Sequence, residues 1–309
     1  MKDRILIVDD EPALRVTLGM RLRSLGYEVS VAADGEEALK KARAELPDLI
    51  LLDRLLPGKS GGEVCRELKR DLWTAYIPVV MFTLLDSIEH RLEGIELGAD
   101  DYLSKDADKR ELEARIQMVL RRFKTGIGTS PLTKLPGNTI IEEQIQQRID
   151  REEAFAVGYL DLDNFKVYND LYGFKRGDEI IIATAKAMLE AVSSCGGPND
   201  FVGHIGGDDF VYVTSPEYIR PIAMRIMETL KVAFPTFYRE DDRRRGWVVA
   251  KDRQGHEQRF PLMSVSIAGL TNRRRQFDLV AEVASVAGEM KKHAKSFKGN
   301  SYVEDKRTG

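Results

Sequence analysis

The sequence predicts an α/β chain of two domains, in which a parallel sheet wrapped by helices on both faces precedes an α+β sandwich. Short apolar runs alternate with amphipathic stretches five times between residue 4 and about residue 123, which is typical of a helix-covered parallel sheet. The segment KTGIGTSP then interrupts this alternation with Gly, Ser and Pro. Beyond it the order of elements changes and centres on a hairpin pattern.

Length and composition fit this organisation. A chain of 309 residues is long enough for two domains with separate cores. The net charge of -3 gives no general reason to expect nucleic acid or an anionic membrane as a partner. No apolar stretch reaches the length of a membrane span, and the N-terminus does not have the pattern of a signal peptide, so we expect a cytoplasmic protein. The two cysteines lie far apart without metal-ligand spacing, which predicts neither a disulfide nor a zinc site.

The first domain is expected to hold five strands, each followed by a helical pattern. The strands are RILIV, YEVSVA, DLILL, IPVVMF and DDYL. Ligands of such sheets bind at the carboxyl ends of the strands. Polar residues stand at those ends: Asp9 and Asp10 after the first strand, Asp53 after the third, Thr83 after the fourth and Lys105 after the fifth. Singly, each is more often a solvated strand end. Together they favour a site for Mg²⁺ and a phosphoryl group.

The segments ILIVDDEP, LILLDRLLPGKSG, VVMFT and GADDYLSKD closely resemble the receiver domain of bacterial response regulators, which has a flavodoxin-like fold. The resemblance covers nearly all of residues 3 to 123. It implies that Asp53 accepts a phosphoryl group from a histidine kinase. It also implies roles for the residues around it: Asp10, Asp53 and the Leu55 carbonyl hold Mg²⁺ or Mn²⁺, Asp9 supports the acid pocket, Thr83 and Lys105 contact the phosphoryl oxygens, and Tyr102 is the switch aromatic.

Two residues depart from the receiver pattern. Asp106 follows the lysine where the family usually has proline, and Leu84 stands where a small residue is common. We assign residues 1–123 to the receiver domain, 124–130 to a linker and 131–309 to the second domain.

The second domain is expected to form an α+β sandwich of ferredoxin-like type, because helices interleave with strands around an antiparallel hairpin. In chain order we expect a helix near 138–151, a strand at 154–163, a helix near 177–194, the hairpin near 206, a helix near 217–233, a strand at 261–270, a helix ending near 295 and a final strand at 301–303.

The hairpin sequence HIGGDDF, residues 204–210, allows two interpretations. Two glycines supply the positive φ of an ordinary tight turn. Alternatively, the acids hold a metal. If the strand ending in YLDLD lies beside this hairpin, Asp161 and Asp208 face each other across the sheet edge. Two carboxylates and a backbone carbonyl form an oxygen cage suited to Mg²⁺ and to nucleotidyl transfer.

The segments SPLTKLPGN, DLDNFKVYNDLYGFKRGDE, HIGGDDF and MSVSIAG resemble, in order and spacing, the GGDEF domain of diguanylate cyclases over residues 130 to 305. The resemblance implies that Asp161, the Leu162 carbonyl and Asp208 bind Mg²⁺ or Mn²⁺. It implies that Asn169 and Asp178 bind the guanine edge, that Asn164, Phe165 and Lys166 line the phosphate and base pocket, and that Lys295 binds the triphosphate. Asp209 stands where the family most often has the glutamate that positions or deprotonates the 3′-hydroxyl.

Two functions follow from this resemblance. The first is a phosphorylation-regulated diguanylate cyclase, in which a homodimer condenses two GTP into cyclic di-GMP and two pyrophosphates. The alternative is a catalytically weak or inactive domain that binds GTP or cyclic di-GMP and signals to a partner. The variant residues Asp209 and His204 favour the alternative. The RxxD product-inhibition motif has Gly197 in place of its arginine, although Asp200 is present. No basic helix-turn-helix pattern follows residue 130, so we expect no DNA binding.

Overall fold

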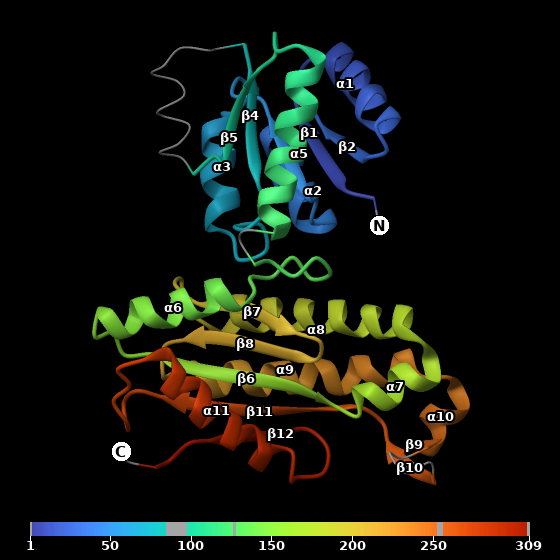
Figure 1. The fold of residues 1–309 in the computed structure, drawn as a ribbon, viewed down its shortest axis with the longest axis vertical. Coiled ribbons are helices and arrows are strands. Elements are labelled where there is room, and N and C mark those ends of the chain that lie inside the picture. The colour runs from blue at the N-terminus through green and yellow to red at the C-terminus, as the bar shows by residue number, and fades with distance from the viewer. Residues whose placement is uncertain (1, 85–97, 126–127, 252–255, 308–309) are drawn as a thin grey trace. The chain divides into compact units, whose positions relative to one another are not determined.

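The computed structural model describes residues 2–84, 98–125, 128–251 and 256–307. The chain divides into two compact units, Met1–Thr129 and Ser130–Gly309. Each unit has its own sheet and its own covering helices, and each is described by itself (Figure 1).

The first unit contains a five-stranded sheet in which every pairing is parallel, as predicted. The strand order is β2-β1-β3-β4-β5. β1 and β3 therefore lie beside each other within the sheet, and the residues that follow them meet at one edge. The bounds are β1 (Arg4–Val8), β2 (Glu28–Ala32), β3 (Leu49–Leu52), β4 (Val79–Thr83) and β5 (Asp101–Ser104).

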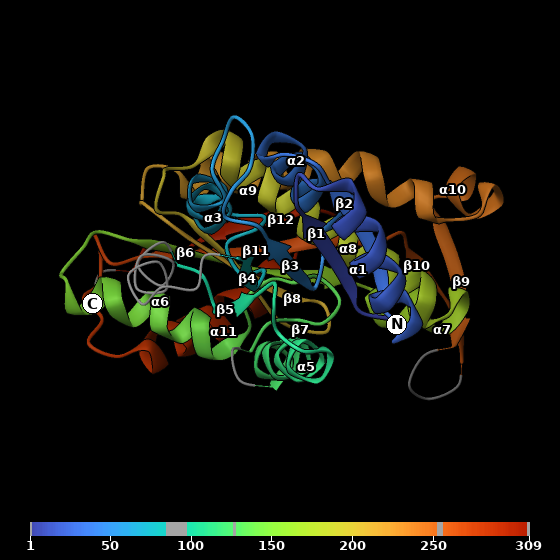
Figure 2. The ribbon, with the colours of Figure 1, turned by 90° about the horizontal axis from the view of Figure 1, so that it is seen from above.

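Helices cover both faces of this sheet and create two apolar cores (Figures 1 and 2). α1 (Pro12–Ser24) and α5 (Lys109–Thr125) pack on one face, while α2 (Gly35–Glu45) and α3 (Gly61–Arg70) pack on the other. The alternation of side chains along β1 supplies both cores, because Ile5 and Ile7 point to one face and Leu6 and Val8 to the other. The helical pattern expected after the fourth strand falls on residues 85–97, outside the described residues.

The second unit contains a mixed sheet of order β12-β11-β6-β8-β7. β6 (Ala156–Asp163) is central and pairs antiparallel with β11 (Ser264–Thr271) and β8 (Asp209–Thr214). β7 (Phe201–Gly206) forms the predicted hairpin with β8, and β12 (Ser301–Glu304) runs parallel to β11. The predicted α+β sheet with an antiparallel hairpin is confirmed, and the hairpin lies at one end of the sheet.

Two pairs of helices enclose this sheet (Figures 1 and 2). α6 (Asn138–Asp150) and α11 (Val280–Ala294) cover one face, and α8 (Phe174–Cys195) and α9 (Ile219–Ala233) cover the other. α8 begins three residues earlier than the predicted helix. The sequence analysis did not predict three short helices: α7 (Phe165–Tyr172), η1 (Phe234–Phe237) and α10 (Glu240–Arg245). A hairpin of β9 (Trp247–Lys251) and β10 (Glu257–Pro261) follows α10.

Candidate functional site

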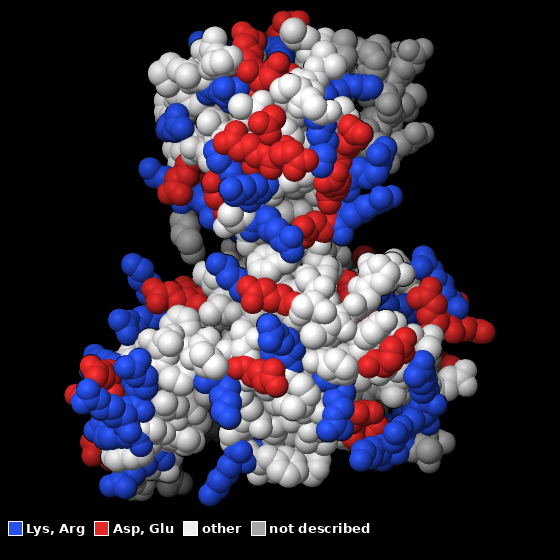
Figure 3. Space-filling view, turned by 180° about the vertical axis from the view of Figure 1, so that it is seen from behind, with Lys and Arg blue, Asp and Glu red and all other residues white. Residues whose placement is uncertain are grey.

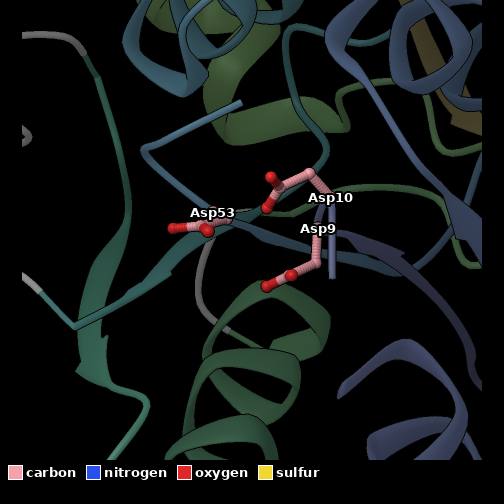
Figure 4. A group of neighbouring side chains, drawn as sticks. All are labelled: Asp9, Asp10 and Asp53. Carbon is pink, nitrogen blue, oxygen red and sulfur yellow. The ribbon is translucent and has the colours of Figure 1, made fainter. Parts of the chain in front are cut away.

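The first unit gathers three carboxylates at the carboxyl edge of its sheet. One oxygen from each of Asp9, Asp10 and Asp53 lies within 4.8 Å of the others (Figure 4). Asp9 and Asp53 are only 1% and 4% exposed, whereas Asp10 is exposed. The cluster forms because Asp9 and Asp10 follow β1 and Asp53 follows the adjacent β3. Its hard oxygen donors fit Mg²⁺ or Mn²⁺.

Lys105 joins two of these carboxylates from the end of β5. Its Nζ lies 2.6 Å from Asp53 Oδ2 and 2.6 Å from Asp9 Oδ2. Burial alone would lower the pKa of Lys105, but the hydrogen bonds to Asp53 and Asp9 raise it more, so its pKa lies above the usual value. Thr83 is the last residue of β4 and is buried at the same edge. The polar residues predicted to meet at this edge therefore lie at its strand ends.

Two backbone N–H groups hold the loop after Asp53 in a tight conformation. Leu55 N donates a hydrogen bond to Asp53 Oδ1 at 3.4 Å, and Gly61 N donates one to the Arg54 carbonyl at 2.9 Å. A Cβ at residue 61 would lie 2.0 Å from the Asp53 carbonyl oxygen, so glycine is required there. The Leu84 side chain, which replaces a small residue of the receiver pattern, is 62% exposed.

In the second unit, Asp161 lies beside Asp209, the second of the two aspartates in the GGDDF motif. In the β6 and β8 register, Asp161 lies directly opposite Asp209, so their side chains share one face of the sheet. A register shift between His204 and Gly206 precedes the turn, in which Gly207 has a φ of 58°. Asp208 is half-buried in the turn, next to the start of β8. The strand predicted to flank the hairpin does so, but the residue directly opposite Asp161 is Asp209 and not Asp208 as predicted.

Two lysines of α11 reach this pair of carboxylates. Lys291 Nζ lies 3.1 Å from Asp161 Oδ2 and also pairs with Asp209 Oδ1. Lys295 Nζ lies 2.5 Å from Asp161 Oδ1. Burial lowers the pKa of Lys291, but its hydrogen bond to Asp209 and the charges of both acids raise it above the usual value. Burial raises the pKa of Asp209, and the Asp161 charge adds to this effect against the opposing effect of Lys291.

Sequence reasoning named Lys295 but missed Lys291, although the two lysines stand four residues apart and therefore share a helix face. It also missed Asp163, whose carboxylate accepts hydrogen bonds from Ser264 Oγ at 2.7 Å and Ser266 Oγ at 3.0 Å. Burial raises the pKa of Asp163. The signal for Asp163 was the alternation in YLDLD, which directs residues 161 and 163 to the same face.

The residues expected to bind the nucleotide lie around α7 and the start of α8. Asn164 adopts a left-handed conformation with a φ of 63° and opens α7, whose first residues are Phe165 and Lys166. Asn169 Oδ1 is buried and has no hydrogen-bond partner among the described residues. A Cβ at Gly177 would lie 1.8 Å from this oxygen, so the glycine admits the amide against α8. The adjoining Asp178 is exposed.

His204 is buried and supports the GGDDF turn through a hydrogen bond. Its Nε2 donates to the Gly207 carbonyl at 3.1 Å, while Nδ1 lies 2.9 Å from Ser130 Oγ and 3.1 Å from Thr133 Oγ1. The ring stacks on Phe210, with centroids 4.3 Å apart. Burial lowers the pKa of His204 and so favours its neutral form, in which Nδ1 accepts a hydrogen bond from a hydroxyl group. The residue therefore ties the start of the second unit to the turn.

Asp200, retained from the RxxD pattern, is buried and faces inward. Its Oδ2 accepts hydrogen bonds from Gly197 N at 2.9 Å and from Thr214 Oγ1 at 2.7 Å. Burial raises the pKa of its carboxyl group. These contacts close the turn between α8 and β7.

The arginine run after residue 242 contributes to a strongly charged arm made of α10 and the β9 and β10 hairpin (Figure 3). Within it, Arg244 pairs with Glu240 and Arg245 pairs with Asp242. The guanidinium groups of Arg245 and Arg259 lie 5.1 Å and 4.3 Å from the Trp247 ring centroid. These intramolecular partners account for much of the charge run.

In the described segments, every helix is too short or too polar to cross a membrane.

Comparison with known proteins assigns both units. The family model of the response regulator receiver domain matches residues 5–117, and that of the diguanylate cyclase GGDEF domain matches residues 129–243. Among curated proteins, the "Probable transcriptional regulator ycf27" of Guillardia theta is 45% identical over 132 residues, which are 43% of this chain and 51% of the relative. The alkaline phosphatase synthesis transcriptional regulatory protein PhoP of Bacillus subtilis is 43% identical over 132 residues, which are 43% of this chain and 54% of the relative.

The chain thus spans about half the length of these curated relatives. Among solved structures, the BeF3-activated receiver domain of Klebsiella pneumoniae RstA is 36% identical and covers 38% of this chain and 99% of its own, with a TM-score of 0.37. The two family matches follow one another along the chain in the order of the two compact units. The chain therefore consists of a response regulator receiver domain followed by a diguanylate cyclase GGDEF domain.

Proposed function

We propose that this protein is a phosphorylation-regulated diguanylate cyclase, which condenses two GTP into cyclic di-GMP and two pyrophosphates. The observation that carries the proposal is the pairing of Asp161 with Asp209 at the ends of adjacent strands. These paired carboxylates would form the reaction centre, and the buried Asn169 Oδ1, which has no hydrogen-bond partner among the described residues, would mark an adjoining base pocket. The GGDEF family match supports the same assignment.

The proposed guanine pocket lies between α7 and α8. Guanine presents N1–H and N2–H donors and an O6 acceptor. The buried Oδ1 of Asn169 has no partner among the residues described and suits one of these donors. The Asp178 carboxylate, one position after the glycine that packs on Asn169, suits another. Asn164, Phe165 and Lys166 would line the phosphate and base pocket, and Lys295 would bind the triphosphate.

The oxygen donors of the second unit fit a hard divalent cation. We propose Asp161, the Leu162 carbonyl and Asp208 as its ligands, with Mg²⁺ or Mn²⁺ as the cation. When bound, the cation supplies charge stabilisation for the α-phosphate and activation of the attacking hydroxyl. The position between Asp161 and Asp209 already accommodates a positive charge, the Lys291 ammonium.

In the proposed reaction, the 3′-hydroxyl of each GTP attacks the α-phosphate of the other. A P–O bond forms at each centre, and pyrophosphate leaves. Each protomer holds one GTP, so the reaction needs a homodimer of the second domain. Asp209 would position or deprotonate the hydroxyl. Compared with glutamate, its carboxylate is withdrawn by roughly 1 Å, and misplacement of that size costs about 100-fold in rate. We therefore expect slow turnover.

The receiver domain supplies the proposed regulation. Asp53 would accept a phosphoryl group from a histidine kinase, beside a cation held by Asp10, Asp53 and the Leu55 carbonyl. Thr83 and the Lys105 ammonium, which contacts Asp53 at 2.6 Å, would stabilise the transferred group.

Incubation of the full chain with GTP and Mg²⁺, with and without beryllofluoride as an acyl-phosphate mimic, tests this proposal. We expect cyclic di-GMP, detected by chromatography and mass spectrometry, in an amount that depends on beryllofluoride. Asp53→Asn should remove that dependence, and Asp161→Asn should abolish product. A chain that binds GTP as an activated dimer but forms no product would refute the cyclase proposal.

A second candidate function is a signalling module that binds GTP or cyclic di-GMP without turnover. The specific observation in its favour is that two ammonium groups, those of Lys291 and Lys295, already neutralise the acids. The Asp209 side chain, which is shorter than that of glutamate, also favours this function. Tight nucleotide binding without pyrophosphate release would favour this function.

A further inference from the structure

Lys291 lies between two carboxylates, and one of them, Asp161, is a proposed ligand of the divalent cation. Its Nζ contacts both Asp161 and Asp209, which face each other across two paired strands. Lys295 contacts Asp161 alone, on its other oxygen. Two carboxylates therefore meet two ammonium groups, and these four side chains together carry no net charge.

Burial strengthens the electrostatic interactions among these side chains. The Asp161 side chain is 6% exposed and that of Lys291 is 21% exposed, so the charges interact at lower effective dielectric than on the surface. A buried carboxylate without a partner is strongly unfavourable. In the absence of a metal, Lys291 thus satisfies both acids from one position.

A divalent cation that binds Asp161 meets two obstacles. The ammonium group excludes it sterically from the space between Asp161 and Asp209, and like charges repel it. Lys291 has a flexible four-carbon stem and can swing away. The Lys295 side chain is 43% exposed and contacts Oδ1 of Asp161, whereas Lys291 contacts Oδ2.

We propose that Lys291 is a resident counter-ion that competes with the divalent cation, so that metal binding requires its displacement from Asp161 and Asp209. This inference rests on the cation site of the proposed function. It adds a determinant of metal affinity that belongs to α11 rather than to the GGDDF turn, and it makes metal occupancy depend on where the Lys291 side chain lies.

Mn²⁺ binding to the full chain, measured from the free Mn²⁺ signal in electron paramagnetic resonance, tests the proposal without any need for turnover. Lys291→Met should raise the affinity of the second unit for Mn²⁺ by about tenfold or more, because a repelling unit charge is removed. Adding Asp161→Asn to Lys291→Met should abolish the gain. Receiver binding is common to all variants and cancels in the comparison.

The matched control is Lys292→Met, which removes the same charge from an exposed neighbour on the same helix. It should leave Mn²⁺ affinity unchanged, and Lys291→Arg should keep it near the wild-type value. Thermal melting gives a second readout, since a ligand that binds the native state raises the melting temperature. Mn²⁺ should raise it more in Lys291→Met than in wild type. Lys291→Gln replaces Lys291→Met in both measurements if the methionine variant does not fold.

Equal Mn²⁺ affinity in wild type and in Lys291→Met, or in the Lys291→Gln variant that replaces it, would overturn the proposal. An equal gain in Lys292→Met would also overturn it. The result separates this inference from the cyclase proposal. Tighter Mn²⁺ binding without cyclic di-GMP leaves Lys291 as the competing ion and refutes the cyclase. Formation of cyclic di-GMP by the wild-type chain, together with unchanged Mn²⁺ affinity in Lys291→Met, would support the cyclase and refute the role of Lys291 as the competing ion.

Discussion

Each domain links two acids through one lysine, and the acids Asp9, Asp53 and Asp161 are buried. Lys105 joins Asp9 to Asp53 in the receiver, and Lys291 joins Asp161 to Asp209 in the GGDEF domain. Removing one partner of a buried ion pair costs about 3 to 5 kcal/mol, because the remaining charge is uncompensated. These lysines therefore act on stability as well as on the chemistry of the sites.

His204 gives a prediction for pH dependence. Its pKa in the folded chain lies below the usual value of 6.5, because burial disfavours the charged ring. As pH falls below 6.5, the unfolded chain binds a proton that the folded chain does not, so the unfolding free energy falls until the folded pKa is reached. Urea unfolding of the second domain at a series of pH values should show this decline.

The control for that measurement is His204→Gln, whose side chain does not titrate. Its stability curve should lose the part of the acid-side decline that His204 causes, while the other histidines contribute equally to both proteins. Identical pH profiles for the two proteins would contradict the assignment.

At the scale of single elements, one glycine of β6 allows the central strands to pair. Gly158 lies opposite Tyr212 of β8, and a Cβ there would lie 2.1 Å from the Tyr212 ring. The ring is fully buried and its hydroxyl donates to the Ile219 carbonyl at 3.0 Å. Gly158→Ala should destabilise the domain by about 1 to 3 kcal/mol or more, as overpacking does.

Gly288→Ala is the matched comparison, because Gly288 lies exposed in the middle of α11 and a Cβ there meets nothing within 4 Å. It should stabilise the domain by about 0.5 to 1 kcal/mol through helix propensity. Urea denaturation midpoints measure both changes. Equal shifts of the same sign would mean that the packing around Gly158 is not limiting.

The predictability of the elements followed the clarity of their apolar patterns. The five receiver strands were predicted from short apolar runs that alternate with helical patterns, and the long helices from apolar periodicity over many residues. α7 was missed because eight residues of mixed polarity follow a strand directly. The alignment of Asp161 with Asp209 depends on the register in which β6 pairs with β8, and no residue pattern specifies that register. Lys291 was missed because it stands in a run of basic residues, and only the bounds of α11 show that it shares a helix face with Lys295.

At the scale of the whole molecule, the two units have separate sheets, and each has its own buried apolar residues. We expect chains 1–129 and 130–309 each to fold alone, as compact domains do. Circular dichroism melts of the two fragments should each show a cooperative transition. A fragment without such a transition would contradict this prediction.

The fragment boundary matters because Ser130 and Thr133 contact His204. A chain that begins at Lys134 lacks both hydroxyl groups and should melt at a lower temperature than one that begins at Ser130. Equal melting temperatures would show that these contacts contribute little to the stability of the domain.

The packing of two guanidinium groups on the Trp247 ring has a practical consequence. The sequence contains two tryptophans, and the other, Trp73, lies in the receiver, where the Arg43 guanidinium is 5.6 Å from its ring centroid. Each domain thus carries its own intrinsic fluorophore. A Trp73→Phe chain would emit from the arm of the GGDEF domain alone, so that conformational changes there can be followed optically without an added dye.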